Sequence, residues 1–576
     1  MASGAATSSG RSGADPAAAE AARPGAGGSS DSLNAPPGFR GTFRSDDVAR
    51  AVYSEAAGVG RILPTAVAVP SDAEDVVTLV RWAAASGVSL TARGSGSSMA
   101  NGAIGPGVIV DLSRLRELGE PDLATQRIVV GPGVTRHELN AAISHTGLVL
   151  PVDPSSSAFA TIGGLVSTNA AGARTVKYGA MRAWVEGLDC VFADGSRAWV
   201  RRGDSLPSVA AAQRFRDEAA TRLRRTPPAA LRHAYVRKQS SGYGVAEWQR
   251  TGSLVDLLVG SEGTLALVVG VQLRLAPQPK ATVGLLAAFP DLEGAAAAAS
   301  RVAALGASAA EMLDRSFLEI AASEGNTLPV ELPRDTEAVL LVEVEEPSEG
   351  IAEHRVHDLA AWCDAGGATF IEKALDDDSA HRLWALRHAA SPILNRLAPK
   401  LQSMQLVEDG CVPRERLPEY VRGVREALDA ARFRGVIFGH AGDGHAHVNA
   451  LVDMTEADWR ERCRLLIEDV TRLVKRLGGT LAGEHGDGRL RAPLLPQVWS
   501  PEALAAFRAV KDAFDPNGIL NPGVKLAEPG ATPLADVKYD PALPPLPQLA
   551  RQALDHIVRT KAWNADRLAL LEPTSE

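Results

Sequence analysis

Residues 161–172 read Thr-Ile-Gly-Gly-Leu-Val-Ser-Thr-Asn-Ala-Ala-Gly, and residues 151–157 just before them read Pro-Val-Asp-Pro-Ser-Ser-Ser. Small residues let a backbone approach a ligand closely, and the hydroxyls and the Asn169 amide can hydrogen-bond a polar one. Two more loops of this kind lie in the same half of the chain, at residues 93–98 (Arg-Gly-Ser-Gly-Ser-Ser) and 259–266 (Val-Gly-Ser-Glu-Gly-Thr-Leu-Ala). Together the three loops predict a large, polyphosphorylated ligand.

The loop at residues 93–98 follows a predicted strand, helix and strand. Thr65–Val69 and Val88–Thr91 read as the strands, and residues 71–74 (Ser-Asp-Ala-Glu) form a capping box that opens the helix. Taken alone, the loop also fits an ordinary tight turn. It lacks the GxGxxG spacing and its distant acidic partner, so a nicotinamide-binding fold is disfavoured.

Composition excludes several classes of protein. The chain has 576 residues and a net charge of -9, with no basic block that would favour nucleic acid or an anionic membrane. The four cysteines lie far apart without a CxxC, which argues against disulfides or an iron–sulfur cluster and fits a reducing cytoplasm. No secretory signal or transmembrane stretch is evident. We therefore expect a cytoplasmic protein. Peripheral attachment to the inner face of the membrane is the alternative location.

The chain divides into four regions by composition. Residues 1–38 form an Ala/Gly/Ser/Pro tail that we expect to be disordered. Residues 39–277 carry the glycine loops, and residues 278–525 change to Ala-rich helices between strands. Residues 526–576 read as a proline-rich strap with a terminal amphipathic helix that has Leu554, Ile557 and Val558 on one face. Within the second region we expect Val255–Leu275 to form two strands with a turn at Glu262-Gly263.

Two short motifs hold four of the 12 histidines. Residues 439–449 read Gly-His-Ala-Gly-Asp-Gly-His-Ala-His-Val-Asn, and residues 483–488 read Gly-Glu-His-Gly-Asp-Gly. Alternation places His445, His447 and Asn449 on one side of a strand, and the glycine turn lets His440 fold back towards them. Two imidazoles and a carboxylate make an open divalent-metal site, with Glu484 as the natural third ligand. Any one of these histidines would equally fit a hydrogen-bonded core position.

These motifs, together with residues 176–179 (Val-Lys-Tyr-Gly), carry a resemblance to a known family. The loops resemble the FAD-binding half of vanillyl-alcohol-oxidase-type flavoenzymes. The nearest branch is similar to the D-2-hydroxyacid dehydrogenases, which include D-lactate dehydrogenase, the glycolate oxidase flavin subunit and D-2-hydroxyglutarate dehydrogenase. The resemblance spans roughly residues 45–525. It implies an α+β fold: a PCMH-type FAD-binding domain of two α+β subdomains, and a ferredoxin-like antiparallel-sheet cap of the FAD-linked oxidase C-terminal type, with C-terminal helices.

The same resemblance implies where FAD binds. The matching segments are the three loops, the tyrosine-bearing segment, and residues 514–523 (Phe-Asp-Pro-Asn-Gly-Ile-Leu-Asn-Pro-Gly), which return from the cap to the flavin ring. Some relatives attach the flavin to a histidine in the first loop, and residues 93–98 contain none, so we expect non-covalent FAD. The implied FAD positions are Arg93, Gly94, Ser95, Gly96, Ser97, Ser98, Asp153, Pro154, Thr161, Gly163, Gly164, Thr168, Asn169, Gly172, Tyr178, Glu262, Gly263 and Asn521.

In the resembled family the two histidine motifs read H-x-G-D-G-N-x-H and G-E-H-G. By position, His440, His447 and Glu484 would bind zinc or manganese, and His485 would act as the base. This chain departs at His445, where the family often has asparagine, and His445 could therefore add a ligand or a substrate contact. The implied chemistry is that the metal orients and acidifies the substrate hydroxyl, a neutral histidine takes its proton, and the flavin N5 takes the hydride.

A substrate carboxylate needs a fixed cation. Residues 384–387 (Trp-Ala-Leu-Arg) resemble a W-x-x-R segment of the family, so Arg387 is the first candidate, since a guanidinium binds carboxylate bidentately. Lys400 is a weaker second candidate, and Arg489 and Arg491 are candidates for a second carboxylate. An arginine on a surface helix is the alternative interpretation of Arg387.

We therefore expect an FAD-linked oxidoreductase that acts on the CH–OH group of a D-2-hydroxyacid of the D-lactate, D-2-hydroxyglutarate or glycolate class. Because the chain shows no NAD fingerprint, haem motif or cysteine cluster, we expect an external electron acceptor: a quinone, an electron-transfer flavoprotein or an iron–sulfur protein. A homodimer is left open. The alternatives are an FAD oxidase of another alcohol or ether lipid, a flavin-free metallohydrolase, and a non-catalytic electron-transfer subunit.

Overall fold

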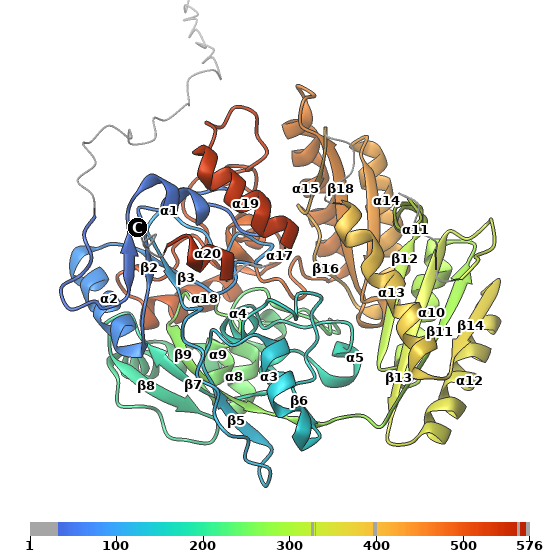
Figure 1. Cartoon of the computed structure of the whole chain (residues 1–576), viewed down its shortest axis with the longest axis horizontal. Helices are drawn as coiled ribbons and strands as arrows, with labels where there is room; N and C mark the ends of the chain where they lie inside the picture. The colour runs from blue at the N-terminus through green and yellow to red at the C-terminus, as the bar shows by residue number, and fades with distance from the viewer. Residues whose placement is uncertain (1–32, 324–327, 329, 395–399, 561–564, 572–576) are drawn as a thin grey trace, which may run out of the picture. The chain divides into compact units, whose positions relative to one another are not determined.

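The computed structural model describes residues 33–323, 328, 330–394, 400–560 and 565–571 (Figure 1). Most of the expected tail lies outside these residues. Among the described residues no helix is long and apolar enough to cross a membrane. All four cysteines are buried with free thiols.

The first sheet has the strand order β1-β2-β4-β3, with β1 antiparallel and the other neighbours parallel. Helix α2 (Ala73–Ser86) connects two of its strands. Its N-cap is Asp72, whose carboxylate accepts from the backbone N–H of Glu74 and Asp75, so the expected cap at Ser71 was placed one residue too early. Asp is as good an N-cap as Ser, which leaves the choice to packing. The strands are β1 (Thr42–Arg44), β2 (Ala66–Val69), β3 (Leu90–Arg93) and β4 (Val108–Asp111).

The second sheet is antiparallel with the order β5-β9-β7-β8. The expectation of two strands over residues 255–275 is wrong in its first half, because Val255–Leu258 is the short helix α9. Periodicity cannot distinguish a short buried helix from a buried strand. Here the backbone turns at Gly260 and Glu262, which both have positive φ, and only β9 continues as a strand. The strands are β5 (Arg127–Val130), β7 (Val185–Val191), β8 (Arg197–Arg201) and β9 (Leu267–Arg274).

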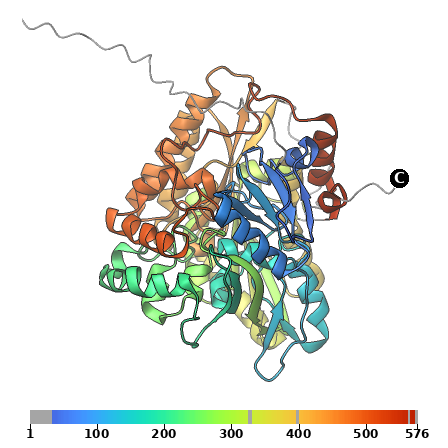
Figure 2. The ribbon, with the colours of Figure 1, turned by 90° about the vertical axis from the view of Figure 1, so that its left-hand side faces the viewer.

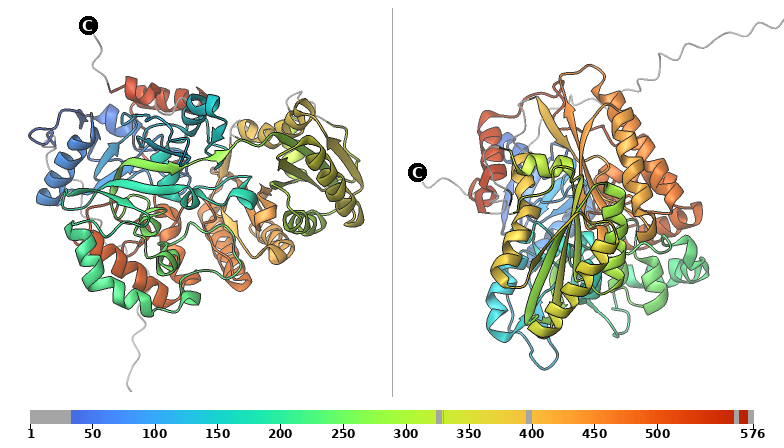
Figure 3. Two further views of the ribbon diagram at one scale, coloured as in Figure 1. Left: turned by 90° about the horizontal axis from the view of Figure 1, so that it is seen from below. Right: turned by 90° about the vertical axis from the view of Figure 1, so that its right-hand side faces the viewer.

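The third sheet is the antiparallel cap, with the order β14-β11-β13-β12-β17-β18-β15 and β16 paired to β18. Helices pack on both of its faces (Figure 3). Helices α10 (Leu292–Ala304), α12 (Glu349–Ala365), α14 (Leu417–Ala430) and α15 (Trp459–Leu477) share a core with one face, and α11 (Arg315–Ala321) and α13 (Asp377–Leu394) with the other. The strands are β11 (Ala281–Phe289), β12 (Ala309–Asp314), β13 (Ala338–Glu346), β14 (Phe370–Ala374), β15 (Leu401–Met404), β16 (Gly410–Cys411), β17 (Arg434–Gly439) and β18 (His445–Asp453).

After the cap the chain returns to the N-terminal half. Helix α18 (Pro501–Phe514) belongs to the core of the second sheet, where Phe514 packs against Phe192 and Phe215. Leu520 then forms a bridge with Leu90 of β3. The last helices, α19 (Gln548–Thr560) and α20 (Ala565–Ala569), lie beside the N-terminal elements, as both Figure 1 and Figure 2 show. The glycine loops and the cap are therefore joined by the chain at two places.

Candidate active site

A cavity of about 460 Å³ is shared by the three glycine loops and the cap. From the cap it is lined by Arg387, Gln405, Glu408, Phe438, His447, Asn449, Glu484 and His485. From the loops it is lined by residues 93–98, Pro154, Thr161, Gly163, Gly164, Thr168, Glu262 and Gly263. The expected cofactor loops and the expected histidine cluster thus face one continuous space.

The glycines of the first two loops are required by close packing. A Cβ on Gly94 would collide with Oγ1 of Thr161, and a Cβ on Gly163 would lie 2.6 Å from Cβ of Pro132. Gly96 has φ +79°, a conformation that L residues rarely adopt. The two loops therefore pack backbone against side chain with no room for larger residues, and their bare backbone lines the cavity. A cavity lined by bare backbone and by the hydroxyls of Ser95, Ser97, Ser98, Thr161 and Thr168 fits a polar cofactor such as FAD.

Five of the predicted FAD positions do not line the cavity: Asp153, Asn169, Gly172, Tyr178 and Asn521. Two of them hold loops in place. Asn169 ends α4 (Ile162–Thr168) with φ +51°, and its Oδ1 accepts from the Arg182 N–H at 2.9 Å. Asn521 is fully buried, and its Nδ2 donates to the carbonyl oxygen of Glu262 at 2.7 Å. Their role in this arrangement is support of the loops.

Asp153 and Tyr178 join the N-terminal half to the cap. Asp153 Oδ2 lies 2.6 Å from Arg174 Nη1, and the same guanidinium binds the Glu343 carboxylate of β13 at 2.5 and 2.8 Å. The Tyr178 hydroxyl donates to Glu345 Oε2 at 2.7 Å. In the structure these side chains therefore belong to the contact between the N-terminal half and the cap.

The histidine motif forms the hairpin of β17 and β18. Gly439, with φ +142°, ends β17, and a single helical turn at Ala441–Asp443 reverses the chain. Phe438 pairs with His447 across the hairpin, and His440, the first residue after β17, lies with its ring 5.2 Å from that of His447. A hydrogen bond holds the loop that bears Glu484, since the Glu484 N–H donates to Asp409 Oδ1 at 3.1 Å.

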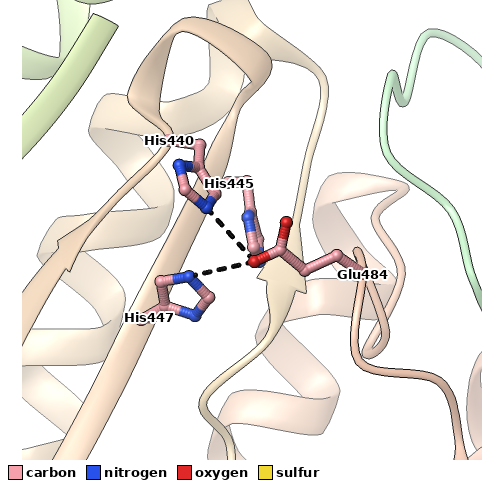
Figure 4. Close-up of side chains that lie close together, drawn as sticks. All are labelled: His440, His445, His447 and Glu484. Atoms are coloured by element: carbon pink, nitrogen blue, oxygen red, sulfur yellow. Dashed lines mark hydrogen bonds and ion pairs between the residues drawn. The ribbon is translucent and has the colours of Figure 1, made fainter. Parts of the chain in front are cut away.

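Figure 4 shows the imidazoles of His440 and His447 directed at one carboxylate oxygen. Glu484 Oε1 lies 3.1 Å from His440 Nε2 and 3.4 Å from His447 Nε2. The opposite ring nitrogens are also engaged: His440 Nδ1 lies 2.6 Å from Glu311 Oε1, and His447 Nδ1 lies 3.0 Å from the carbonyl oxygen of Glu408. Acceptors at Nδ1 fix the tautomer that leaves Nε2 free for a metal.

The donor set fits a divalent metal. His440, His445, His447 and Glu484 are all buried and offer ligand atoms within 4.8 Å of one another. Burial raises the pKa of Glu484, but the Lys238 ammonium, 3.0 Å from Oε2, and His440 outweigh it and hold that pKa well below its usual range. A carboxylate with two imidazoles is a donor set that suits zinc, and carboxylate oxygen also suits manganese.

His445 occupies a different position in the cluster. Its Nε2 lies 2.9 Å from Asp409 Oδ1, and its Nδ1 is buried without a hydrogen-bond partner among the described residues. Burial lowers the pKa of His445 to about 3, so the imidazole is neutral. His445 therefore braces the Asp409 carboxylate that holds the Glu484 loop.

His485 is held through its Nδ1, and its Nε2 faces the Glu484 carboxylate. Its Nδ1 lies 2.8 Å from Glu408 Oε2, and its Nε2 lies 3.5 Å from Glu484 Oε1. Burial alone would lower the pKa of His485, but the carboxylates of Glu408 and Asp409 raise it to about 10. A divalent cation at Glu484 and His447 would oppose these carboxylates and bring the pKa down. The ring stacks on that of His447 at a centroid distance of 5.2 Å.

Arg387 lines the cavity and is 5% exposed. Its Nε donates to Glu311 Oε2 at 2.6 Å, and the guanidinium lies 5.0 Å from the Phe438 ring centroid. The surface-helix interpretation of Arg387 is therefore wrong. Lys400, by contrast, is exposed beside β15 and does not belong to the described cavity lining, because the strand carries it away from the hairpin turn.

Arg489 and Arg491 are structural in this arrangement. Arg491 is fully buried, pairs with Glu408 and donates to the Gly486 carbonyl oxygen at 2.6 Å. Arg489 donates to the Asn521 amide oxygen at 2.9 Å and to the Pro522 carbonyl oxygen at 2.8 Å. Neither belongs to the described lining of the cavity, so their proposed role in binding a second carboxylate is not supported.

Sequence reasoning missed four charged residues of this site: Glu311, Glu408, Asp409 and Lys238. A signal existed for three of them. Glu311 interrupts the apolar strand β12 and is 0% exposed, and Glu408-Asp409 follow an apolar run directly before a glycine. Buried carboxylates in apolar segments require partners, and these partners are the site histidines and arginines. Lys238 lies in a segment without such a pattern.

Family models and known proteins agree on the ancestry of the chain. Residues 64–201 match the FAD binding domain, and residues 278–524 match the C-terminal domain of FAD linked oxidases. Glycolate oxidase subunit GlcD of Bacillus subtilis is 30% identical over 491 residues, which cover 84% of this chain and 94% of the relative. D-lactate dehydrogenase of Archaeoglobus fulgidus is 30% identical over 462 residues, covering 79% and 90%.

A solved structure shares the fold. The 4-ethylphenol oxidase from Gulosibacter chungangensis superimposes with a TM-score of 0.62 at 17% identity, covering 85% of this chain and 95% of its own. The expected α+β fold, a PCMH-type FAD-binding domain followed by a C-terminal domain of the FAD-linked oxidase type, is confirmed. With the matches to the family models and the relatives of known activity, the chain belongs to the FAD-linked oxidoreductases related to glycolate oxidase and D-lactate dehydrogenase.

Proposed function

We propose that this enzyme oxidises a D-2-hydroxyacid of the D-lactate, D-2-hydroxyglutarate or glycolate class to the 2-oxoacid and passes the electrons to an external acceptor. The observation that carries the proposal is the shared cavity, in which the FAD loops face Arg387, Glu484 and His485. The names of the two relatives above support a small hydroxyacid. The flavin-free metallohydrolase alternative conflicts with the FAD-binding domain.

The first two glycine loops would hold FAD non-covalently, since residues 93–98 contain no histidine. When bound, FAD supplies the hydride acceptor for the substrate carbon. His440, His447 and Glu484 would hold zinc or manganese, and such an ion supplies Lewis acidity that lowers the pKa of the substrate hydroxyl.

Arg387 is suited to bind the substrate carboxylate. Its contact with Glu311 through Nε fixes the plane of the guanidinium, and the side chain has little exposure to bulk water. A fixed guanidinium pairs with a carboxylate at less entropic cost than a mobile lysine. Arg387 would therefore set the orientation of the acid, with its hydroxyl-bearing carbon towards the histidine cluster.

His485 would accept the hydroxyl proton at Nε2. Its Nδ1 lies 2.8 Å from Glu408 Oε2, which selects the tautomer with a proton on Nδ1 and stabilises the imidazolium once it forms. Arg491 compensates the Glu408 charge from the other side. The Glu408 carboxylate thus holds His485 in one orientation, and Arg491 holds the Glu408 carboxylate.

The proposal is tested by anaerobic reduction of the purified yellow protein with D-lactate, D-2-hydroxyglutarate or glycolate. We expect one acid to bleach the flavin absorbance, His485→Gln to slow bleaching by roughly a hundredfold or more, and a chelator to weaken it. The exposed His145→Gln serves as the matched control. Bleaching by a phenol or simple alcohol and by none of the three acids would favour the oxidase alternative and overturn the proposal.

A further inference from the structure

The described residues of the C-terminal segment, 537–560 and 565–571, contact the first glycine loop through Arg567, although the match to the family model ends at residue 524. Lys538, Tyr539 and Val558 of this segment line the cavity. Leu571 and Ala550 are buried in one cluster with Tyr53, Val67 and Ile109 of the N-terminal half. The segment is therefore part of the folded core beside the loop, and it forms part of the cavity wall.

Arg567 of α20 makes the contact with the loop. It is 1% exposed, and its two terminal nitrogens donate to the carbonyl oxygens of Ser95 at 2.8 Å and Gly94 at 3.1 Å. One rigid guanidinium thus holds two successive carbonyl groups. A trans peptide directs its N–H opposite to its C=O, and the described residues contain no cis peptide bond. The N–H groups of Ser95 and Gly96 therefore point away from Arg567.

The surroundings of Arg567 carry excess positive charge. The Tyr53 ring lies 5.0 Å from the Arg567 guanidinium and 5.1 Å from that of Arg93, and both arginines are buried. The nearest carboxylate is Asp111, 3.7 Å from Arg567 and hydrogen-bonded by the Tyr53 hydroxyl at 2.6 Å. Two guanidinium groups thus share one buried carboxylate.

This imbalance suits an anion. The Nε atoms of Arg93 and Arg567 are buried without a hydrogen-bond partner among the described residues. Burial and the neighbouring Arg567 lower the pKa of Arg93 to about 9, which reflects the cost of two cations in one apolar region. A phosphate group near the loop would lower that cost, because opposite charges attract strongly in a poorly solvated site.

We propose that Arg567 is a positioning residue of the FAD site and that the C-terminal segment is a working part of it. Arg567 holds the carbonyls of Gly94 and Ser95 on its own side, so that the loop presents N–H groups to the anionic pyrophosphate of FAD. Tyr539 and Val558 complete the wall of the cavity. The inference rests on FAD binding within the proposed function, and it is independent of the hydroxyacid and the metal.

The test is the FAD dissociation constant of the apo-protein, measured by flavin fluorescence with no hydroxyacid or metal added. For Arg567→Met we expect an increase of at least about tenfold, and Arg567→Lys should restore part of the affinity. The control is Arg559→Met, an exposed arginine of the adjacent helix α19. Thermal unfolding of each apo-protein checks that it is folded. A folded Arg567→Met protein with FAD affinity within twofold of wild type would overturn the proposal.

A second variant decides the matter if Arg567→Met does not fold. Val558 is 37% exposed and lines the cavity, so Val558→Asp adds a negative charge to the wall without opening the core. We expect FAD affinity to fall severalfold, while Gln552→Asp, which adds the same charge at an exposed position of α19, leaves it unchanged. Equal FAD affinities for the two variants would mean that the C-terminal segment does not contribute to FAD binding, and would refute the inference. A protein that binds FAD normally but oxidises none of the three acids would refute only the proposed function.

Discussion

At the scale of single residues, one buried carboxylate connects the expected metal site to the expected substrate arginine. Glu311 is 0% exposed and binds His440 Nδ1 through one oxygen and Arg387 Nε through the other, both at 2.6 Å. Burial would raise the pKa of Glu311, but its contacts with His440 and the Arg387 guanidinium outweigh burial and lower that pKa. Glu311 therefore orients both groups from one position.

Replacing this carboxylate tests that connection. In Glu311→Gln only one side-chain oxygen can still accept a hydrogen bond, and the amide NH2 cannot accept from the second donor. One of the two contacts is therefore lost, and we expect zinc affinity to fall roughly 10- to 100-fold. Titration of the metal-free protein with zinc measures the effect, and circular dichroism checks the fold. The control is Glu319→Gln, an exposed glutamate of α11. Unchanged zinc affinity in Glu311→Gln would show that His440 is not a ligand or needs no such support.

A second residue, His233, contributes to the pH dependence of stability away from the histidine cluster. Burial lowers the pKa of His233 to about 4, its Nε2 has no hydrogen-bond partner among the described residues, and its ring lies 4.3 Å from that of Trp499. The unfolded chain, with a histidine pKa near 6.5, binds more protons than the native protein between about pH 4 and pH 6.5. This histidine therefore stabilises the fold less as the pH falls through that window.

We expect His233→Phe to flatten the decline of the unfolding midpoint between pH 6.5 and pH 4.5. Differential scanning fluorimetry across this range measures the slope for wild type and variant. His137→Phe, at an exposed position, is the matched control and should leave the slope unchanged. The two variants would share one slope if His233 titrated in the native protein as it does in the unfolded chain.

At the scale of elements, the β17–β18 hairpin owes its shape to glycines. Gly444 has φ +77°, and a Cβ there would collide with the carbonyl oxygen of Val412. Gly478, which ends α15, has φ +72° but no atom within 4 Å of such a Cβ. Gly444 and Gly478 therefore share a backbone conformation with positive φ, but only at Gly444 would an added Cβ collide with another atom.

This pair separates strain from collision. Gly478→Ala should cost about 1 kcal/mol from the positive φ alone. Gly444→Ala should cost at least roughly 2 kcal/mol more, because the hairpin must shift to relieve the overlap. Chemical denaturation measures both, and zinc affinity should fall only in Gly444→Ala. Equal losses would mean that the hairpin yields to the added methyl without disturbing its histidines.

At the scale of the whole molecule, a partly buried ion network around the buried carboxylates Glu343 and Glu345 joins the N-terminal half to the cap. Arg174 binds Asp153 of its own half and Glu343 of the cap, and lies 3.2 Å from Glu345. Lys177 and Tyr178 add contacts to Glu345. Because the cavity is lined from both halves, this network helps to hold its two walls together.

Loss of Arg174 should leave Glu343 and Glu345 as neighbouring buried carboxylates without their main cation. We expect Arg174→Met to lower the unfolding midpoint by several degrees, since removing one partner of a buried pair costs about 3–5 kcal/mol. Calorimetry should also show a broader or split transition. Arg136→Met is the control, because Arg136 pairs with the same Asp153 inside the N-terminal half. An identical transition in both variants would contradict a special role for the bridge.

Contiguous motifs carried most of the successful prediction. Two segments could be predicted from their sequence, the loop at residues 93–98 and the hairpin at residues 440–449. Their glycines and alternating side chains act through local backbone geometry. The short helix at Val255–Leu258 was misread because its pattern does not differ from that of a buried strand. Lys400 lies exposed at the end of β15 that is distant from the hairpin turn, outside the described lining of the cavity, because the direction of a strand is set by its partners in the sheet.

The family, the glycine loops that line the cavity and the two histidine motifs could be predicted from the sequence, since each is a contiguous run of residues whose pattern acts through local backbone geometry. Which charges hold these groups follows from the tertiary structure alone. Glu311 and Glu408 meet the histidines across the sheet of the cap. Arg567 reaches a loop 472 residues earlier in the chain. Single charged residues carry no local signal of their partners, because the partners are selected by how the sheets and helices pack.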